Sequence, residues 1–209
     1  MEIKKGSVVL FQGDSITYAG RNYEDDSLLG TGYAMMSAAW FNALHPELNI
    51  KFINRGASGD TALRLKERWQ RDCIDLKPDV VSILIGINDC GRGFEKNDPS
   101  TAEEFKANYG FLLNEIKNKL NAQLILCEPF LIPAADCGKQ MWRQDLDAKI
   151  HVIRELAREF NAAYLPFDGI FASASTKRAP EFWAADGIHP SHAGHALMAK
   201  SWLEAVKAI

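Results

Sequence analysis

The chain has 209 residues, of which 47% are hydrophobic and 24% are charged. These fractions are typical of a globular protein, and they exclude a disordered chain, a collagen and a coiled coil. The 24 Lys and Arg residues and the 27 Asp and Glu residues give a net charge of -3, with no densely basic stretch. Neither nucleic acid nor a membrane surface is therefore an expected partner. The charge balance instead favours a small neutral partner, and the length favours a single domain over residues 1–209.

The sequence shows no targeting or membrane segment. The first apolar run, at 8–11, is too short for the core of a signal peptide, and nothing else approaches the length of a membrane span. The four cysteines Cys73, Cys90, Cys127 and Cys137 form no C-x-x-C pair. Reduced, packed thiols explain them better than disulfides or a zinc site. We therefore expect a cytoplasmic protein without a metal or a cofactor.

Five short apolar runs predict β-strands. The stronger runs are apolar at successive positions, which is typical of parallel strands that are buried on both faces. The predicted strands are 8–11, 50–53, 80–85, 124–127 and 163–165.

Helical patterns fill the gaps between these runs. Leu146, Ile150, Ile153 and Ala157, for example, follow one another at steps of four, three and four residues, as on the buried face of a helix. The predicted helices are 33–44, 61–73, 105–120, 146–160 and 191–206. Regular alternation of strand and helix predicts a three-layer α/β sandwich with a parallel, flavodoxin-like sheet in the strand order 2-1-3-4-5. In such sheets ligands bind beyond the carboxyl ends of the strands.

Two glycine-containing segments follow the first two predicted strands. Gly13, Asp14 and Ser15 follow the first strand, where Asp and Ser are also the ordinary residues of a turn or a helix cap. The segment 54–61 follows the second strand and contains Gly59. This segment is either a plain strand-to-helix loop or an anion site formed by the Gly59 N–H near a helix N-terminus.

Two further polar segments complete the pattern. Asn88 follows the third strand, where its side chain either forms a local turn or donates to a developing oxyanion. Asp186 stands three residues before His189, with Gly187 between them and Pro190 after them. This spacing lets the carboxylate reach the Nδ1–H of the imidazole.

In this order, the four segments resemble the four sequence blocks of the SGNH, or GDSL, hydrolase superfamily. Within it, the residues at 11–17, 30–33, 68–69 and 189–195 are similar to bacterial intracellular acetyl xylan esterases. The resemblance implies a serine esterase with Ser15 as the nucleophile, His189 as the base and Asp186 as its orienting carboxylate. It also implies an oxyanion hole made of the Ser15 N–H, the Gly59 N–H and the Asn88 side chain. The implied substrates are short acyl esters, such as acetylated xylooligosaccharides.

Several alternatives stay open at this stage. A thioesterase, an arylesterase or a short-chain lipase of the same superfamily would use the same residues. His189, His192 and His195 invite a metal site, and a non-catalytic, flavodoxin-like sugar-binding module would share the fold. A homo-oligomer is also compatible with the sequence. Three side chains stand in positions that allow them to face a sugar: Arg92, Trp142 and Trp183.

Overall fold

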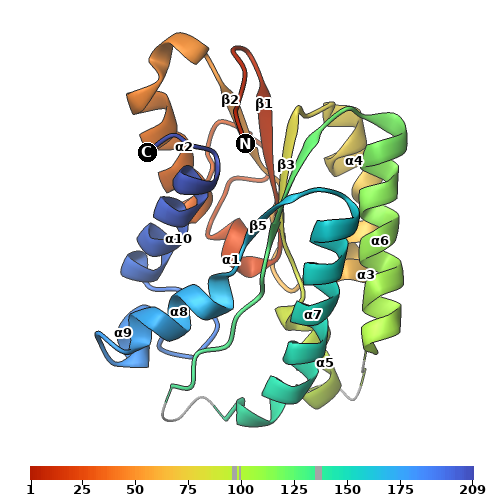
Figure 1. The fold of residues 1–209 in the computed structure, drawn as a ribbon, viewed down its shortest axis with the longest axis vertical. Helices are drawn as coiled ribbons and strands as arrows, with labels where there is room; N and C mark the ends of the chain where they lie inside the picture. The colour runs from red at the N-terminus through yellow and green to blue at the C-terminus, as the bar shows by residue number, and fades with distance from the viewer. Residues whose placement is uncertain (96–97, 99, 135–137) are drawn as a thin grey trace.

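The computed structural model describes residues 1–95, 98, 100–134 and 138–209. Its centre is a five-stranded parallel sheet in the order β2-β1-β3-β4-β5, which confirms the predicted strand order. In Figure 1 the strands stand edge-on between two groups of helices, so the predicted three-layer sandwich is confirmed as well. The strands are β1 (Val8–Gly13), β2 (Lys51–Asn54), β3 (Val80–Leu84), β4 (Gln123–Cys127) and β5 (Ala163–Leu165).

The strand β1 is central, with β2 on one side and β3 on the other. Phe11 of β1 pairs with Asn54 of β2 and with Ser82 of β3, so the three strands end at nearly the same level. The segments that follow these three strands therefore start from one edge of the sheet, which lies below the strands in Figure 1, on the side where α1 and α5 are drawn.

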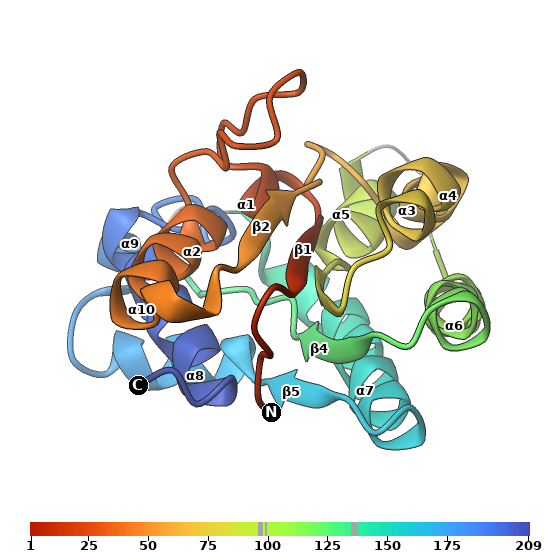
Figure 2. The same cartoon turned by 90° about the horizontal axis from the view of Figure 1, so that it is seen from above.

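Alternate residues of β1 face two separate hydrophobic cores. Val9 and Phe11 pack in one core together with Trp202, whereas Leu10 packs in the other together with Trp69. Figure 2 shows α2, α8, α9 and α10 on one side of the sheet and α3 to α7 on the other. The first group comprises α2 (Tyr33–Leu44), α8 (Phe167–Ser175), α9 (Pro180–Trp183) and α10 (His192–Ala205); the second comprises α3 (Ala62–Glu67), α4 (Trp69–Asp72), α5 (Ile87–Glu95), α6 (Ala102–Lys119) and α7 (Arg143–Glu159).

Polar caps explain where several helices begin. The side chain of Thr61 accepts from the N–H of Arg64 at the start of α3, and Ser191 accepts from Gly194 at the start of α10. Thr101 begins α6 with a reciprocal capping box. The remaining short elements are α1 (Ser15–Tyr18) and the 3₁₀ turns η1 (Pro46–Leu48), η2 (Ile74–Leu76) and η3 (Gln140–Trp142).

The predicted helix 61–73 is wrong in its continuity, because the structure divides it into α3 and α4. The break falls at Arg68, whose guanidinium binds the carboxylates of Asp60 and Asp72 and the side chain of Gln12. Helices α5, α8 and α9 were not predicted. The first contains two glycines and the last has four residues, so neither has a long apolar repeat to reveal it.

Three of the cysteines are buried free thiols, namely Cys73, Cys90 and Cys127, as predicted. Cys137 lies outside the described residues. None of the helices in the described part of the chain is both long and apolar enough to cross a membrane.

Candidate active site

Ser15 begins α1 directly at the end of β1. Asp14 caps this helix, because its Oδ1 accepts a hydrogen bond of 3.0 Å from the N–H of Ile16. Gly13 has a φ of +154°, and a Cβ atom on it would lie 2.2 Å from the carbonyl oxygen of Leu84. Only glycine fits this crossing, so the chain turns sharply and places Ser15 at the edge of the sheet.

Ser15, His189 and Asp186 form a continuous hydrogen-bonded chain. The Ser15 Oγ lies 2.9 Å from the Nε2 of His189, and the His189 Nδ1 lies 2.6 Å from the Oδ2 of Asp186. A carboxylate is an acceptor, so Nδ1 donates to Asp186 and Nε2 is left to accept from the serine hydroxyl. The structure therefore brings together the three residues that the sequence analysis selected, across 174 positions of the chain.

The loop that carries His189 also fixes the carboxylate of Asp186. The Oδ1 of Asp186 accepts from the N–H groups of Ile188, at 3.0 Å, and His189, at 2.8 Å. Burial favours a higher pKa for Asp186, but these hydrogen bonds and the one from the His189 ring outweigh it and hold the pKa below its ordinary value. Asp186 is thus held as a carboxylate whose second oxygen faces the imidazole.

Gly59 lies in the turn after β2, and Asn88, in the first turn of α5, contacts that turn. The N–H of Ala57 donates to the carbonyl oxygen of Gly13 at 3.0 Å, which joins the turn to the end of β1. The Asn88 Nδ2 donates to the carbonyl oxygen of Asp60 at 2.9 Å, so its second hydrogen stays available. Gly59 has a φ of +78° and faces open space. Within the described ranges, the N–H groups of Ser15 and Gly59 donate to no protein acceptor.

Asn54, at the end of β2, was missed by the sequence analysis. Its Nδ2 donates to the carbonyl oxygens of Thr17, at 2.7 Å, and Leu29, at 2.8 Å, while its Oδ1 accepts from the N–H of Gly56 at 2.9 Å. It is almost fully buried. Asn54 therefore ties α1 to the turn that carries Gly59. An asparagine two residues before a glycine at a strand end was the available signal.

Two buried acids stand next to Ser15 and Asn88 in the chain. Asp14 is fully buried, and burial raises its pKa to about 7 although the N–H of Ile16 opposes this. Its Oδ2 has no hydrogen-bond partner in the part of the chain that the structure describes. Burial likewise raises the pKa of Asp89 to about 6, although both of its oxygens accept from the N–H of Ala62 at 3.1 Å. Burial therefore makes both of these carboxyl groups harder to ionise than they are in water.

The three histidines near the C-terminus do not act as one set. His189 contacts Ser15, whereas His195 is buried and accepts a hydrogen bond of 3.1 Å from the N–H of Tyr33 at its Nδ1. His192 is exposed on the first turn of α10. In residues 1–95, 98, 100–134 and 138–209, no three His, Cys, Asp or Glu side chains are arranged to hold a metal ion. The alternative of a histidine metal site thus has no ligand set there.

The three side chains considered for sugar contact differ in place. Trp142 belongs to the core, where it stacks on Phe94 and packs against Gly91. Trp183 is partly buried in α9, beside Phe182. Arg92 lines a polar cavity next to the Asn88 helix. Of the three, Trp142 was therefore the wrong choice for contact with a ligand.

Comparison with known proteins shows which family the chain belongs to. Residues 11–197 match the model of the GDSL-like Lipase/Acylhydrolase family. The chain belongs to this family. It is a carboxylic ester hydrolase of the GDSL type, as the resemblance of its four segments implied.

Similar proteins cover nearly the whole of this GDSL hydrolase. An acetylxylan esterase from Geobacillus stearothermophilus is 35% identical over 99% of this chain and 96% of its own. Its solved structure superposes with a TM-score of 0.90. A GDSL-like lipase from Parabacteroides merdae gives a TM-score of 0.95 at 36% identity, over 100% of this chain and 99% of that one. Structures of the Geobacillus enzyme include catalytic mutants in which a histidine, a serine or an aspartate is replaced by alanine.

Proposed function

We propose that this GDSL hydrolase removes acetyl groups from acetylated xylooligosaccharides, with Ser15, His189 and Asp186 as its catalytic triad. The observation that carries the proposal is the hydrogen-bonded chain from the Ser15 Oγ to the His189 Nε2 and from the His189 Nδ1 to Asp186. The full-length similarity to an acetylxylan esterase supports the choice of acyl group and sugar.

In the proposed acylation step, the Ser15 Oγ attacks the ester carbonyl carbon while the Nε2 of His189 takes the hydroxyl proton. A new Oγ–C bond forms, and the carbonyl oxygen becomes an oxyanion. The C–O bond to the sugar then breaks, and His189 returns the proton to the departing sugar oxygen. Asp186 holds the ring in the required tautomer and stabilises its positive charge. Water then hydrolyses the acetyl-enzyme with His189 as the base.

The proposed oxyanion hole consists of the Ser15 N–H, the Gly59 N–H and the free hydrogen of the Asn88 amide. These donors follow β1, β2 and β3, which end at one level of the sheet. Preorganised donors stabilise the oxyanion without having to reorient during the reaction.

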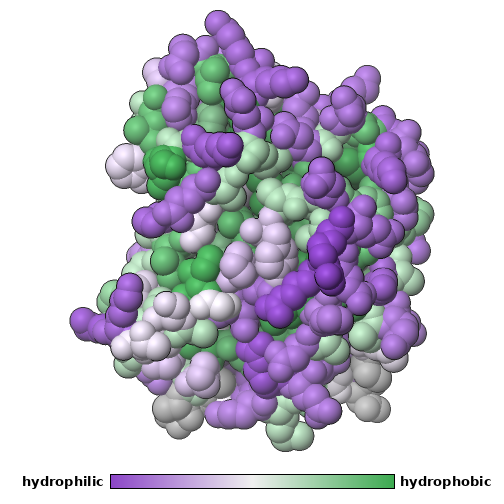
Figure 3. Space-filling view, viewed as in Figure 1, coloured by the Kyte–Doolittle hydropathy of each residue, from purple (hydrophilic) through white to green (hydrophobic). Residues whose placement is uncertain are grey.

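The face of the molecule drawn in Figure 3 supports short, water-soluble esters over fats. In Figure 3 hydrophilic side chains cover much of the visible face, and the apolar side chains occur in small groups between them. An interfacial lipase would instead present a broad apolar surface.

The test compares wild type with Ser15→Ala on acetylated xylotriose and on an acetyl-CoA thioester. We expect the wild type to release acetate from the sugar faster than from the thioester, and Ser15→Ala to release it from neither. A serine-directed fluorophosphonate should label the wild type and not the variant. Retained turnover by Ser15→Ala would refute the triad, and preference for the thioester would refute the sugar ester as substrate.

A further inference from the structure

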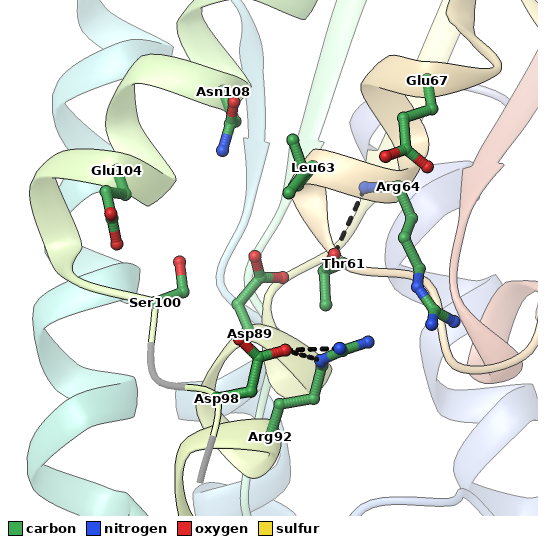
Figure 4. Close-up of a pocket in the computed structure, with 10 residues that line it drawn as sticks. All are labelled: Thr61, Leu63, Arg64, Glu67, Asp89, Arg92, Asp98, Ser100, Glu104 and Asn108. Carbon is green, nitrogen blue, oxygen red and sulfur yellow. Dashed lines mark hydrogen bonds and ion pairs between the residues drawn. The ribbon is translucent and has the colours of Figure 1, made fainter. Parts of the chain in front are cut away.

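A polar cavity of about 470 Å³ lies between α3, α5 and α6 (Figure 4). Its size falls within the range of small-molecule sites. Among the described residues that line it, only Leu63 is apolar. Helix α3 contributes Arg64 and Glu67, and α6 contributes Asn108.

The cavity shares two chain segments with the proposed oxyanion hole. Its wall includes Thr61 and Asp89, which directly follow Asp60 and Asn88 in the chain. The Asn88 side chain donates to the Asp60 carbonyl oxygen at 2.9 Å, and the Asp89 carboxylate accepts from the N–H of Ala62 at 3.1 Å. These two contacts join the start of α5 to the segment before α3, so they hold both Asn88 and the cavity wall in position.

Several hydrogen-bonding groups of this cavity are unused. Within the described residues, the side chains of Arg64, Glu67, Asn108 and Ser100 make no hydrogen bond to protein atoms, whereas Arg92 is bound to Asp98. In Figure 4, Asn108 and Ser100 lie on one side of the space, and Arg64 and Glu67 lie on the other. Donors and acceptors thus line the cavity on two sides, from α3 on one side and from Ser100 and α6 on the other.

A buried lysine holds the backbone of Ser100 in position. The Nζ of Lys149, which is fully buried, donates to the Ser100 carbonyl oxygen at 2.9 Å and to Asp145 at 2.7 Å. A side of the cavity that is already ordered costs less conformational entropy when a ligand binds.

The lining selects a neutral, polyhydroxylated ligand. Arg92 is paired with Asp98, and Asp89 and Glu104 accept from backbone N–H groups. Arg64 and Glu67 are therefore left with one charge of each sign, which favours neither an anion nor a cation. The shortage of apolar side chains disfavours an acyl chain. Sugar hydroxyl groups both donate and accept, so they match a wall that offers both kinds of group. The carboxylates are Glu67, Asp89, Asp98 and Glu104, and the guanidinium groups are those of Arg64 and Arg92.

We infer that this cavity is a subsite for a neutral sugar unit linked to the acetylated one. The inference rests on the proposed function, since it assigns the place of the neighbouring xylose units of the same substrate. In this subsite Asn108 and Glu67 would determine the preference for longer xylooligosaccharides without contacting the reacting atoms.

The kinetic test compares acetylated xylotriose with acetylated xylose. We expect wild type to have a higher kcat/KM for the trisaccharide, and Asn108→Ala to lower the trisaccharide-to-monosaccharide ratio roughly three- to tenfold, the value of one hydrogen bond. Glu67→Ala should lower it by at least as much. Asn118→Ala is the matched control, because Asn118 is exposed on the same helix and does not line the cavity. An unchanged ratio in both cavity variants would overturn the subsite while leaving the proposed function intact.

A binding test separates the two claims. Unacetylated xylotetraose, titrated into wild type, should shift the NMR signal of the Asn108 side-chain amide, and Asn108→Ala should weaken the binding. If xylotetraose binds there while acetylated sugars are not hydrolysed, the subsite stands and the proposed function fails. If acetylated xylotriose is hydrolysed and xylotetraose leaves the amide signal unmoved, the subsite is refuted.

Discussion

His195 links acid pH to stability because its imidazole is buried. It is buried beneath α2, and its Nδ1 accepts from the N–H of Tyr33, the first residue of that helix. Burial, together with the charges of His192 and His189, lowers the pKa of His195 to about 4, from an ordinary value of 6.5. The positive end of the α2 dipole acts in the same direction, and protonation would also remove the acceptor for Tyr33.

The size of the effect follows from the two pKa values. Each pKa unit corresponds to about 1.4 kcal/mol, so neutral His195 contributes about 3 kcal/mol to the free energy of unfolding. Because the folded-state pKa of His195 is lowered to about 4, this contribution is complete above pH 6.5 and is lost as the pH falls toward 4.

The assay uses His195→Asn, because the Asn Oδ1 can accept from the N–H of Tyr33 but does not titrate. Urea unfolding of both proteins between pH 7.5 and pH 3.5 gives the stability difference at each pH, in which the other titrating groups cancel. We expect wild type to lose about 3 kcal/mol relative to the variant over this range. A constant difference, or an NMR titration that places the pKa of His195 near 6.5, would refute the reasoning.

Four further predictions follow from the site. Burial raises the pKa of Asp14 to about 7, so its ionisation lowers the free energy of unfolding of wild type as the pH rises through that range. The free energy of unfolding of Asp14→Asn, measured in urea, should therefore rise by about 4 kcal/mol relative to that of wild type between pH 4 and pH 8, and equal pH profiles would contradict this. Asn88→Ala should lower kcat roughly a hundredfold with little change in KM, whereas a rise in KM alone would remove Asn88 from the oxyanion hole. Asp186→Asn should lower kcat roughly a thousandfold or more, because the wrong tautomer of His189 then faces Ser15; near-normal turnover would show that Asp186 does not orient the ring. Across p-nitrophenyl esters, kcat/KM should fall by a factor of tens from acetate to octanoate, and an optimum at eight carbons would indicate an open acyl channel.

The sheet and the residues at its edge were predictable for a common physical reason. Strands buried on both faces are apolar throughout, so 8–11 and 80–85 stood out, and parallel strands bring the segments that follow them to one edge. The three-residue spacing of Asp186 and His189 is local, and the family resemblance added Ser15. The catalytic roles themselves stay predictions.

Contacts between distant side chains and backbone were not predictable. The break at Arg68 depends on carboxylates and on Gln12 of β1, which come together only in the folded chain. Asn54 likewise acts on carbonyl groups 25 and 37 residues away. A tryptophan can stack on a sugar or pack in a core, so the residue type of Trp142 did not decide between the two. Its packing on Gly91, which only the structure shows, places it in the core.

The serine helix α1 has four residues, which is too short for its own hydrogen bonds to maintain it. Its shape is imposed from outside, by Asn54 on the Thr17 carbonyl oxygen and by the Tyr33 hydroxyl, 3.0 Å from that of Thr17. The position of Ser15 is thus maintained by the packing around α1, since Ile16 of this helix is fully buried and belongs to the same core as Phe11. Loss of activity on warming should therefore accompany the unfolding of that core and not precede it.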